Sequence, residues 1–287
     1  MLAPAKINLD LLITGRRDDG YHLLDSIVVF ADYGDQLTAE ISDQLSLDIS
    51  GPFGENLTAD QDNLILKAAK LIGEKANISP NVKFHLVKNL PISSGIGGGS
   101  ADGAAALKLI IDLYELKISA SELNEIALKL GADVPVCLFG KPVQMTGIGD
   151  KLNILKFTKE IDLLLVNPGV SVSTNQIFSK YNSLNNDFDQ PRKFSYHDIN
   201  LPFLVETLKQ SKNALQAFAI ENEKIINDVL MALSETEGAK ITRMSGSGAT
   251  CFALYEDFET CQLAAEGISR RNPKWWVKQV KVGTSKA

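Results

Sequence analysis

Four glycines fall within residues 95–99, between an apolar segment and an alanine-rich segment near the middle of this chain. Glycine adopts backbone conformations with positive φ and lets a ligand approach the main chain closely. Ser100 follows the run, and we predict that it caps a helix covering about residues 101–115. The unpaired N–H groups and the positive end of the helix dipole would then point into the loop, an arrangement that binds phosphate. A nucleotide is therefore the first ligand to consider.

The residues around the glycines argue against three common phosphate loops. A P-loop ends in Gly-Lys-Ser or Gly-Lys-Thr, but here Gly99 is followed by Ser100 and Ala101, with no lysine. A dinucleotide fingerprint has a third glycine where this chain has Ser100, and its acidic residue ends a strand, whereas Glu115 precedes a second predicted helix. The Val-Ala-Ile-Lys strand that follows a protein-kinase glycine loop is absent. A flexible turn without a ligand is disfavoured, because a strand and a capped helix bracket the loop closely.

The composition is that of an ordinary globular protein. Of 287 residues, 45% are hydrophobic and 22% are charged, which allows one large domain or two smaller ones. The formal net charge of −6 argues against a nucleic-acid partner, which would require a basic surface. No apolar run approaches the roughly 20 residues of a membrane span, and the first residues lack a signal-peptide pattern. We therefore expect neither a nucleic-acid nor a membrane partner.

The cysteines and histidines show no metal or disulfide pattern. Cys137, Cys251 and Cys261 form no C-x-x-C pair, which favours reduced thiols and a cytoplasmic location. The three histidines lie far apart and lack the H-E-x-x-H spacing, so we predict no histidine metal site.

Hydrophobic periodicity predicts mixed α/β structure in the first part of the chain. Strands are predicted at residues 2–14, 22–33, 36–41, 45–50, 82–86, 142–147 and 151–157. Helices are predicted at residues 63–76, 101–115 and 120–130. For the last helix, Ser119 and Glu122 form a possible capping box and Gly131 a stop.

The second part of the chain has a different order of elements, and Thr158-Lys159-Glu160 is the predicted boundary. Beyond it we predict a strand at 161–166, a helical region at 202–236, strands at 239–244 and 250–256, a helix at 257–270 and a strand at 275–282. This β-α-β-β-α-β order is typical of ferredoxin-like domains. Residues 182–198 are polar and contain Pro191, so we expect a mobile surface loop there.

Three separated segments together resemble one family. Residues 4–8 read Pro-Ala-Lys-Ile-Asn and lead to Gly-Tyr-His at 20–22, the glycine loop lies within residues 90–107, and Gly-Ala-Asp-Val-Pro follows a helix at 131–135. In this order they resemble the GHMP kinase superfamily of small-molecule kinases. The first two motifs are similar to its 4-diphosphocytidyl-2-C-methyl-D-erythritol kinase family in particular. Residues 244–248, Met-Ser-Gly-Ser-Gly, stand where the superfamily has its third motif, although a hairpin turn explains them almost as well.

The resemblance implies an α+β, two-domain GHMP kinase fold. Residues 1–158 would form an N-terminal domain like the second domain of ribosomal protein S5, and residues 159–287 a ferredoxin-like domain. The implied reaction uses ATP, with Mg²⁺, to phosphorylate the 2-hydroxyl of the small-molecule substrate 4-diphosphocytidyl-2-C-methyl-D-erythritol, in the methylerythritol phosphate route to isoprenoid precursors. Mevalonate or homoserine are alternative substrates, and a non-catalytic nucleotide- or RNA-binding protein is an alternative of another class. We expect a monomer or a weak homodimer.

The resemblance also implies two catalytic residues. Asp133 is the expected base that takes the proton of the attacking hydroxyl. Lys6 is expected to hold Asp133 ionised and to stabilise charge on the reacting groups. Without the motifs, Asp133 would be interpreted as a loop carboxylate bound to backbone amides, and Lys6 as an exposed lysine at a strand end. No carboxylate is assigned as a ligand of Mg²⁺, and Ser100 is expected to lie near the ion.

The remaining implied residues bind the two substrates. The ATP contacts are expected at Pro91, Ile92, Ser93, Ser94, Gly95, Ile96, Gly97, Gly98, Gly99, Ser100 and Ala101. Asn8 and Thr174 are expected to face the alcohol substrate. Tyr21, His22 and Phe178 are expected to sandwich and hydrogen-bond its cytosine, since aromatic faces stack well on bases. For Tyr21 and Phe178, ordinary core packing is an equally good interpretation when each is taken alone.

Overall fold

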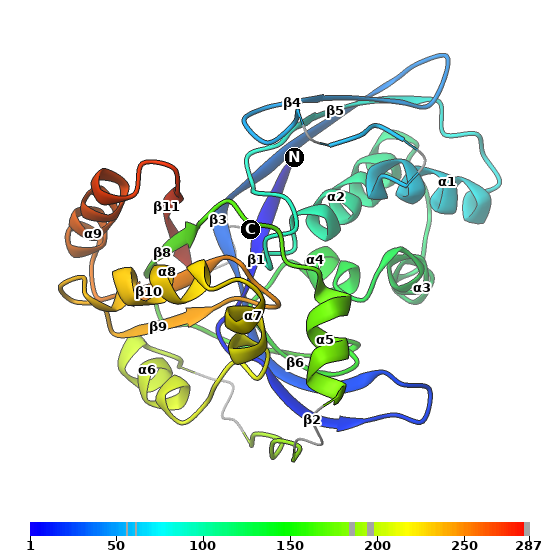
Figure 1. The fold of residues 1–287 in the computed structure, drawn as a ribbon. Helices are drawn as coiled ribbons and strands as arrows, with labels where there is room; N and C mark the ends of the chain where they lie inside the picture. Colours follow the sequence, from blue (N-terminus) through cyan, green and yellow to red (C-terminus); the bar gives the residue numbers. More distant parts are fainter. Residues whose placement is uncertain (56, 61, 184–186, 194–197, 284–287) are drawn as a thin grey trace. The chain divides into compact units, whose positions relative to one another are not determined.

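The structure is a computed structural model that describes residues 1–55, 57–60, 62–183, 187–193 and 198–283 (Figure 1). The chain forms two compact units, which alternate along the sequence. Unit 1 comprises Met1–Ala5, Tyr33–Ile92 and Gly97–Gly140, and unit 2 comprises Lys6–Asp32, Ser93–Ile96 and Lys141–Ala287. The predicted division into consecutive domains near residue 158 stays a prediction.

Unit 1 contains strands and a group of helices. The second half of β3 (His22–Ile41) pairs antiparallel with β5 (Val82–Val87), and β5 pairs parallel with β4 (Ser46–Ser50). In β5 every second side chain is buried, as the alternation in the sequence predicts for a strand with one face toward the core. The helices are α1 (Leu64–Ala76), α2 (Gly98–Leu113), α3 (Ala120–Leu130) and α4 (Val134–Phe139); α1 packs against α2, and α2 against α4.

Local capping signals in unit 1 match the helix ends. Asn63 caps α1 by accepting a hydrogen bond from the N–H of Ile65. The predicted capping box of Ser119 and Glu122 is present at the start of α3. Gly103 would weaken an isolated α2 by roughly 1 kcal/mol relative to alanine. A Cβ at this position would lie 3.3 Å from Cβ of Leu64, so the glycine allows α1 to approach α2 closely.

Unit 2 contains an antiparallel sheet with the strand order β11-β8-β10-β9. Its strands are β8 (Ile161–Asn167), β9 (Ile241–Met244), β10 (Cys251–Tyr255) and β11 (Trp276–Val282). Helices α8 (Ile225–Ser234) and α9 (Phe258–Arg271) pack against these strands, as Figure 1 shows. All five residues of β10 are buried, which is expected for a central strand. The predicted β-α-β-β-α-β order of this region is confirmed.

The rest of unit 2 is built from shorter elements. The first half of β3 pairs antiparallel with β2 (Leu12–Arg16) and with β6 (Val143–Gly147), and β6 pairs with β7 (Lys151–Ile154). The remaining helices are α5 (Thr174–Ser183), α6 (Leu201–Lys209) and α7 (Gln216–Asn222). The predicted helical region at 202–236 is therefore divided into α6, α7 and α8.

Several predicted boundaries were wrong. Residues 22–41 form the single strand β3 and not two strands, because the polar residues around Gly34 remain in the strand; a Cβ on Gly34 would meet the backbone of Ala3 at 2.0 Å, so the neighbouring chain passes very close. The predicted strand at 2–14 is divided into β1 (Leu2–Asn8) and β2. Helix α4 has six residues and is too short to show a helical period, and α5 was not predicted.

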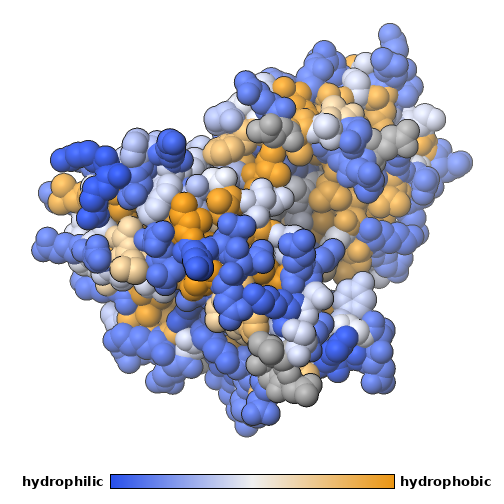
Figure 2. Space-filling model, viewed as in Figure 1, coloured by the Kyte–Doolittle hydropathy of each residue, from blue (hydrophilic) through white to orange (hydrophobic). Residues whose placement is uncertain are grey.

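The predicted loop at 182–198 is only partly described. Residues 184–186 and 194–197 lie outside the described residues, and 187–193 contain no helix or strand. Arg192 nevertheless binds two buried aspartates of unit 2, as shown below. On the face seen in Figure 2, hydrophilic side chains predominate, with smaller hydrophobic areas between them. Among the described helices, none has the length and apolar character needed to cross a bilayer.

Candidate active site

The glycine loop, residues 91–101, has the backbone conformation that its glycines predict. Gly95 and Gly97 have φ of 75° and 64°, in the left-handed region that favours glycine. A Cβ on Gly95 would lie 2.4 Å from the carbonyl oxygen of Ser245, so a side chain there would displace the backbone of another segment. The loop is therefore fixed in shape by both its own backbone and its packing within unit 2.

Helix α2 begins earlier than predicted. Gly97 is the N-cap residue, and no side chain caps the helix. The prediction that Ser100 is the cap was wrong, because Gly97 in the left-handed conformation turns the chain into the helix three residues before Ser100. The N-cap residue therefore offers no side-chain acceptor to the N–H groups of the first helical turn, and the positive end of the dipole lies in the glycine loop. This geometry suits an anion.

The Ser-Gly turn, residues 245–248, contacts the glycine loop directly. The hydroxyl of Ser245 donates a hydrogen bond to the carbonyl oxygen of Gly95 at 3.0 Å. The N–H of Thr250, just after the turn, donates to the carbonyl oxygen of Ser94 at 3.0 Å. Residues 244–248 are therefore more than a hairpin turn, since they support the loop that the glycine motif builds.

Strand β1 also contacts the glycine loop and the Ser-Gly turn. The backbone N–H of Lys6 donates to the carbonyl oxygen of Ile96 at 2.9 Å, and the N–H of Asn8 donates to Oγ of Ser245 at 3.0 Å. The side chains of Lys6 and Asn8 are 3% and 1% exposed, so neither is the solvent-facing strand residue that its type would suggest. Three motifs that are distant in the sequence thus meet within unit 2.

Asn8 has one unsatisfied polar atom. Its Nδ2 donates to Oγ of Ser26 at 2.7 Å, whereas its Oδ1 is buried and has no hydrogen-bond partner among the described residues. Thr174, at the start of α5, lies close to the same turn because its hydroxyl is 2.8 Å from that of Ser247. Asn8 and Thr174, both predicted to face the alcohol, are therefore joined through the Ser-Gly turn.

The residues predicted to hold cytosine lie mainly around the start of β3 and α5. The rings of His22 and Phe178 stack with centroids 5.0 Å apart and an interplanar angle of 30°. Nε2 of His22 also lies 2.6 Å from Oδ1 of Asn182, and the ring makes an edge contact with Tyr181. Tyr21 is 58% exposed, which rules out core packing as the reason for its presence.

Asp133 lies in unit 1, directly before α4. It is the N-cap residue of this helix, its side chain makes no capping hydrogen bond, and it is half-buried. Its carboxylate therefore does not cap α4. The described residues contain no group of three or more His, Cys, Asp or Glu side chains that could hold a metal ion.

A buried charge cluster that no sequence motif indicated lies next to the glycine loop in unit 1. Nζ of Lys88 is 2.5 Å from Oδ2 of Asp35 and 2.6 Å from Oδ2 of Asp102, and all three side chains are at most 4% exposed. A Cβ on Gly98 would lie 3.1 Å from this Nζ. Lys88 therefore ties β3 to the N-terminal part of α2. A lysine between the apolar residues Leu86 and Leu90 was the available signal.

The ionisation of this cluster follows from its charges. Burial raises the pKa of Asp102 to about 7, although the nearby Lys88 acts in the opposite direction. For Lys88 burial alone would lower the pKa, but the two carboxylates outweigh it and raise the pKa. One cation thus stays charged between two carboxyl groups, and one carboxyl group keeps its proton into the neutral range.

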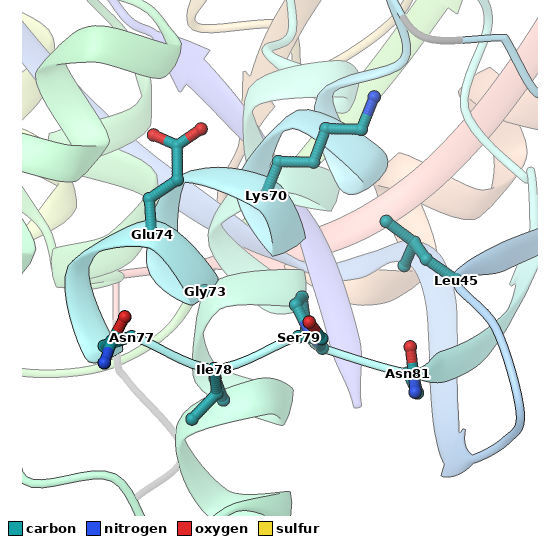
Figure 3. A pocket seen from close by; sticks show the side chains of 9 residues that line it. Leu45, Lys70, Gly73, Glu74, Asn77, Ile78, Ser79 and Asn81 are labelled. Carbon is teal, nitrogen blue, oxygen red and sulfur yellow. The ribbon is translucent and has the colours of Figure 1, made fainter.

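A separate surface pocket of about 400 Å³ lies at the end of α1 (Figure 3). Its lining includes Lys70, Glu74, Asn77 and Asn81, and none of the predicted site residues. The two charged side chains point away from each other in Figure 3 and do not converge on one point. This pocket has no role in the chemistry discussed below.

Known proteins resemble this chain over nearly its whole length. Residues 63–141 match the family model of the GHMP kinases N terminal domain. A 4-diphosphocytidyl-2-C-methyl-D-erythritol kinase of Chelativorans sp. (strain BNC1) is 43% identical over 286 residues, which are 99% of this chain and 96% of that relative. A crystal structure of 4-(cytidine 5'-diphospho)-2C-methyl-D-erythritol kinase has a TM-score of 0.78 and 29% identity, over 99% of each chain.

More distant structures share the fold alone. The structure of L. major mevalonate kinase in complex with R-mevalonate has a TM-score of 0.64 but only 18% identity, over 100% of this chain and 96% of the other.

Proposed function

Because the chain belongs to the 4-diphosphocytidyl-2-C-methyl-D-erythritol kinase family, we propose that it transfers the γ-phosphoryl group of ATP to the 2-hydroxyl of 4-diphosphocytidyl-2-C-methyl-D-erythritol. The reaction is a step of the methylerythritol phosphate route to isoprenoid precursors. The single observation that supports it best is the link from Asn8 through Ser245 to Gly95, which brings the family's opening motif, its glycine loop and its third motif together.

The glycine loop is the proposed triphosphate site. Its glycines leave the backbone open, and the first turn of α2 offers N–H groups without a side-chain cap. The ATP contacts are Pro91, Ile92, Ser93, Ser94, Gly95, Ile96, Gly97, Gly98, Gly99, Ser100 and Ala101. Mg²⁺ supplies charge neutralisation for the phosphates during transfer. The described residues contain no group of three or more His, Cys, Asp or Glu side chains for it, and Ser100 is the residue that we propose to lie near the ion.

Asp133 and Lys6 carry the proposed chemistry. The 2-hydroxyl oxygen forms a bond to the γ-phosphorus while the bond from that phosphorus to the β-bridging oxygen breaks and ADP leaves. Asp133 accepts the proton of the hydroxyl. The role assigned to Lys6 is to keep Asp133 ionised and to stabilise the charge on the reacting groups.

The substrate's cytosine and alcohol have separate contacts. Tyr21 is exposed at the start of β3, where a large ring is free to cover a base, and Phe178 already stacks on His22. Thr174 and Phe178 are four residues apart on α5 and therefore lie on one face of the helix. We assign cytosine binding to Tyr21, His22 and Phe178, and alcohol binding to Asn8 and Thr174.

The GHMP kinase fold with mixed α/β content is shown by these relatives and by the structure. We propose the finer classification as well: a ribosomal protein S5 domain 2-like domain in residues 1–158 and a ferredoxin-like domain in residues 159–287. The strand order β11-β8-β10-β9 supports the second assignment, because the β-α-β-β-α-β order is typical of that fold. A cytoplasmic location and a monomer or weak homodimer stay predictions.

The decisive experiment is a coupled assay of ADP release by the purified protein with ATP, Mg²⁺ and 4-diphosphocytidyl-2-C-methyl-D-erythritol. We expect turnover that depends on this alcohol and is absent with mevalonate or homoserine. Turnover with mevalonate alone would contradict the proposal and favour another kinase of the superfamily. ATP binding without turnover of any of the three alcohols would favour a non-catalytic nucleotide-binding protein.

A further inference from the structure

The direction of the Asn8 side-chain amide is set by a chain of hydrogen bonds that the proposed function does not use. Nδ2 of Asn8 donates to Oγ of Ser26 at 2.7 Å, and Oγ of Ser26 donates to the carbonyl oxygen of Asp10 at 2.6 Å. A serine hydroxyl can donate one hydrogen bond, and here the backbone carbonyl oxygen of Asp10 accepts it. Ser26 can therefore only accept from Asn8, so the nitrogen of the amide, not the oxygen, must face Ser26.

The amide oxygen consequently points away from Ser26. It is the buried Oδ1 that has no hydrogen-bond partner among the described residues. Leaving a buried acceptor unsatisfied costs free energy, so each such atom calls for an explanation. Gly246 lies beside it: a Cβ at this position would be 3.4 Å from Oδ1, and φ of Gly246 is +54°. The glycine keeps the space next to the oxygen free of a side chain.

We propose that Ser26 is a positioning residue, which holds Asn8 so that its Oδ1 accepts a hydrogen bond from the hydroxyl of the alcohol substrate. The inference rests on the proposed function, in which Asn8 contacts that alcohol. It adds a residue outside the recognised motifs. Ser26 does not touch the substrate, and it acts through the orientation of Asn8.

Asp10, the last residue in this chain of hydrogen bonds, is itself held firmly in place. Its Oδ1 accepts a hydrogen bond from the N–H of Ile27 at 2.8 Å, and its Oδ2 accepts one from the hydroxyl of Ser211 at 2.5 Å. The guanidinium of Arg192 adds an ion pair to Oδ2 at 2.6 Å. Asp10 is fully buried, so its carbonyl oxygen, which accepts the hydrogen bond from Ser26, has little freedom to move.

The test is the variant Ser26→Ala, measured by steady-state kinetics with the wild-type protein as reference. Loss of the hydroxyl frees the Asn8 amide to rotate, and the loss of one oriented hydrogen bond corresponds to a fall in kcat/KM for the alcohol of about tenfold. The KM for ATP should change little. Ser26→Thr keeps a hydroxyl on a strand residue and should restore most of the activity.

A double-mutant cycle separates positioning from general stability. In an Asn8→Ala background the amide is gone, so Ser26→Ala should have almost no further effect on kcat/KM. Ser234→Ala is the control, because its hydroxyl is exposed on α8 and donates to the carbonyl oxygen of Met231, outside the hydrogen bonds that join Asn8, Ser26 and Asp10. It should leave the kinetic constants for the alcohol unchanged.

Two results would overturn the inference. One is an equal loss from Ser26→Ala in the wild-type and Asn8→Ala backgrounds, and the other is unchanged kcat/KM in Ser26→Ala while the wild-type protein turns over the alcohol. Absence of turnover by the wild-type protein would instead overturn the proposed function, and this assignment with it. The two failures are therefore distinguishable in one set of assays.

Discussion

Oγ of Ser245 accepts a hydrogen bond from the backbone N–H of Asn8 at 3.0 Å, although 237 positions separate the two residues. The same hydroxyl donates to the carbonyl oxygen of Gly95. One fully buried serine therefore connects the first strand, the Ser-Gly turn and the glycine loop. The contact explains why the Ser-Gly turn belongs to the site even though it carries no ionisable group.

Ser245→Ala should weaken both the fold and nucleotide binding. The substitution removes the partner of a buried N–H and of a partly buried carbonyl oxygen, and we expect a loss of about 1–3 kcal/mol in the free energy of unfolding. The KM for ATP should rise several-fold because Gly95 loses its support. Urea denaturation and kinetics would measure the two effects. Ser234→Ala, an exposed serine on α8, is the control and should change stability by less than about 0.5 kcal/mol.

Arg192→Met should be strongly destabilising. Arg192 pairs with Asp10 at 2.6 Å and with Asp25 at 3.0 Å, and both carboxylates are at most 1% exposed. Removal of the guanidinium leaves two buried charges without their cation, which costs about 3–5 kcal/mol. Arg17→Met removes an exposed arginine paired with Asp19 and should cost less than about 1 kcal/mol. Similar urea midpoints for the two variants would contradict this interpretation.

Tyr21→Ala should affect one substrate and not the fold. Tyr21 is 58% exposed, so its removal creates no cavity. Loss of a ring stacked on cytosine, worth about 1–3 kcal/mol, should raise the KM for the cytidine-containing alcohol roughly 5- to 150-fold. The KM for ATP and the melting temperature should stay near the wild-type values. Phe258→Ala removes an equally exposed aromatic residue from α9 and should leave all three quantities unchanged.

Elements whose signals are local could be predicted from the sequence. The alternation in β5 and the capping box of α3 depend on neighbouring residues, and both appear as expected. The start of α2 depends on a competition between two local signals. Ser100 is the better capping side chain, but Gly97 adopts the left-handed conformation and starts the helix earlier. Side-chain preference was outweighed there by backbone freedom.

Contacts between distant segments could not be predicted in the same way. The buried Asp10, between β1 and β2, pairs with the partly buried Arg192, yet nothing in the spacing of charges along the sequence indicates this ion pair. The family resemblance named Asn8 but not Ser26, because the role of Ser26 depends on which atom its hydroxyl proton faces. Sequence motifs thus identified residues that are proposed to touch the substrates. The structure adds residues that contact and position these side chains.

Asp102→Asn should change how stability depends on pH. Burial raises the pKa of Asp102 to about 7 in the folded protein, well above its usual value. Between about pH 4 and pH 7 the unfolded chain loses this proton while the folded protein keeps it, so wild-type stability should fall as pH rises through this range. Asparagine does not titrate, and above pH 7 the variant should be more stable than the wild type by about 1–3 kcal/mol.

Urea denaturation at several pH values would test this prediction. Asp48→Asn is the control, because Asp48 is exposed and its hydrogen bond with Lys83 lowers its pKa. It should not remove the decline in stability between pH 4 and pH 7. A parallel decline in the wild-type protein and in Asp102→Asn would show that another group titrates in this range.

Asp133→Asn and Lys6→Met test whether these two residues act as one unit in catalysis. Removal of the base should lower kcat by about 10²–10⁴ with little change in the affinity for ATP. If Lys6 acts by keeping Asp133 ionised, its loss should matter much less once Asp133 is already replaced. The double variant should then lose little more activity than Asp133→Asn alone. If the fold-losses in kcat of the two single variants instead multiply in the double variant, Lys6 stabilises the phosphoryl group independently of the base. Normal kcat in Asp133→Asn would remove Asp133 from the mechanism, and another acceptor for the hydroxyl proton would be required.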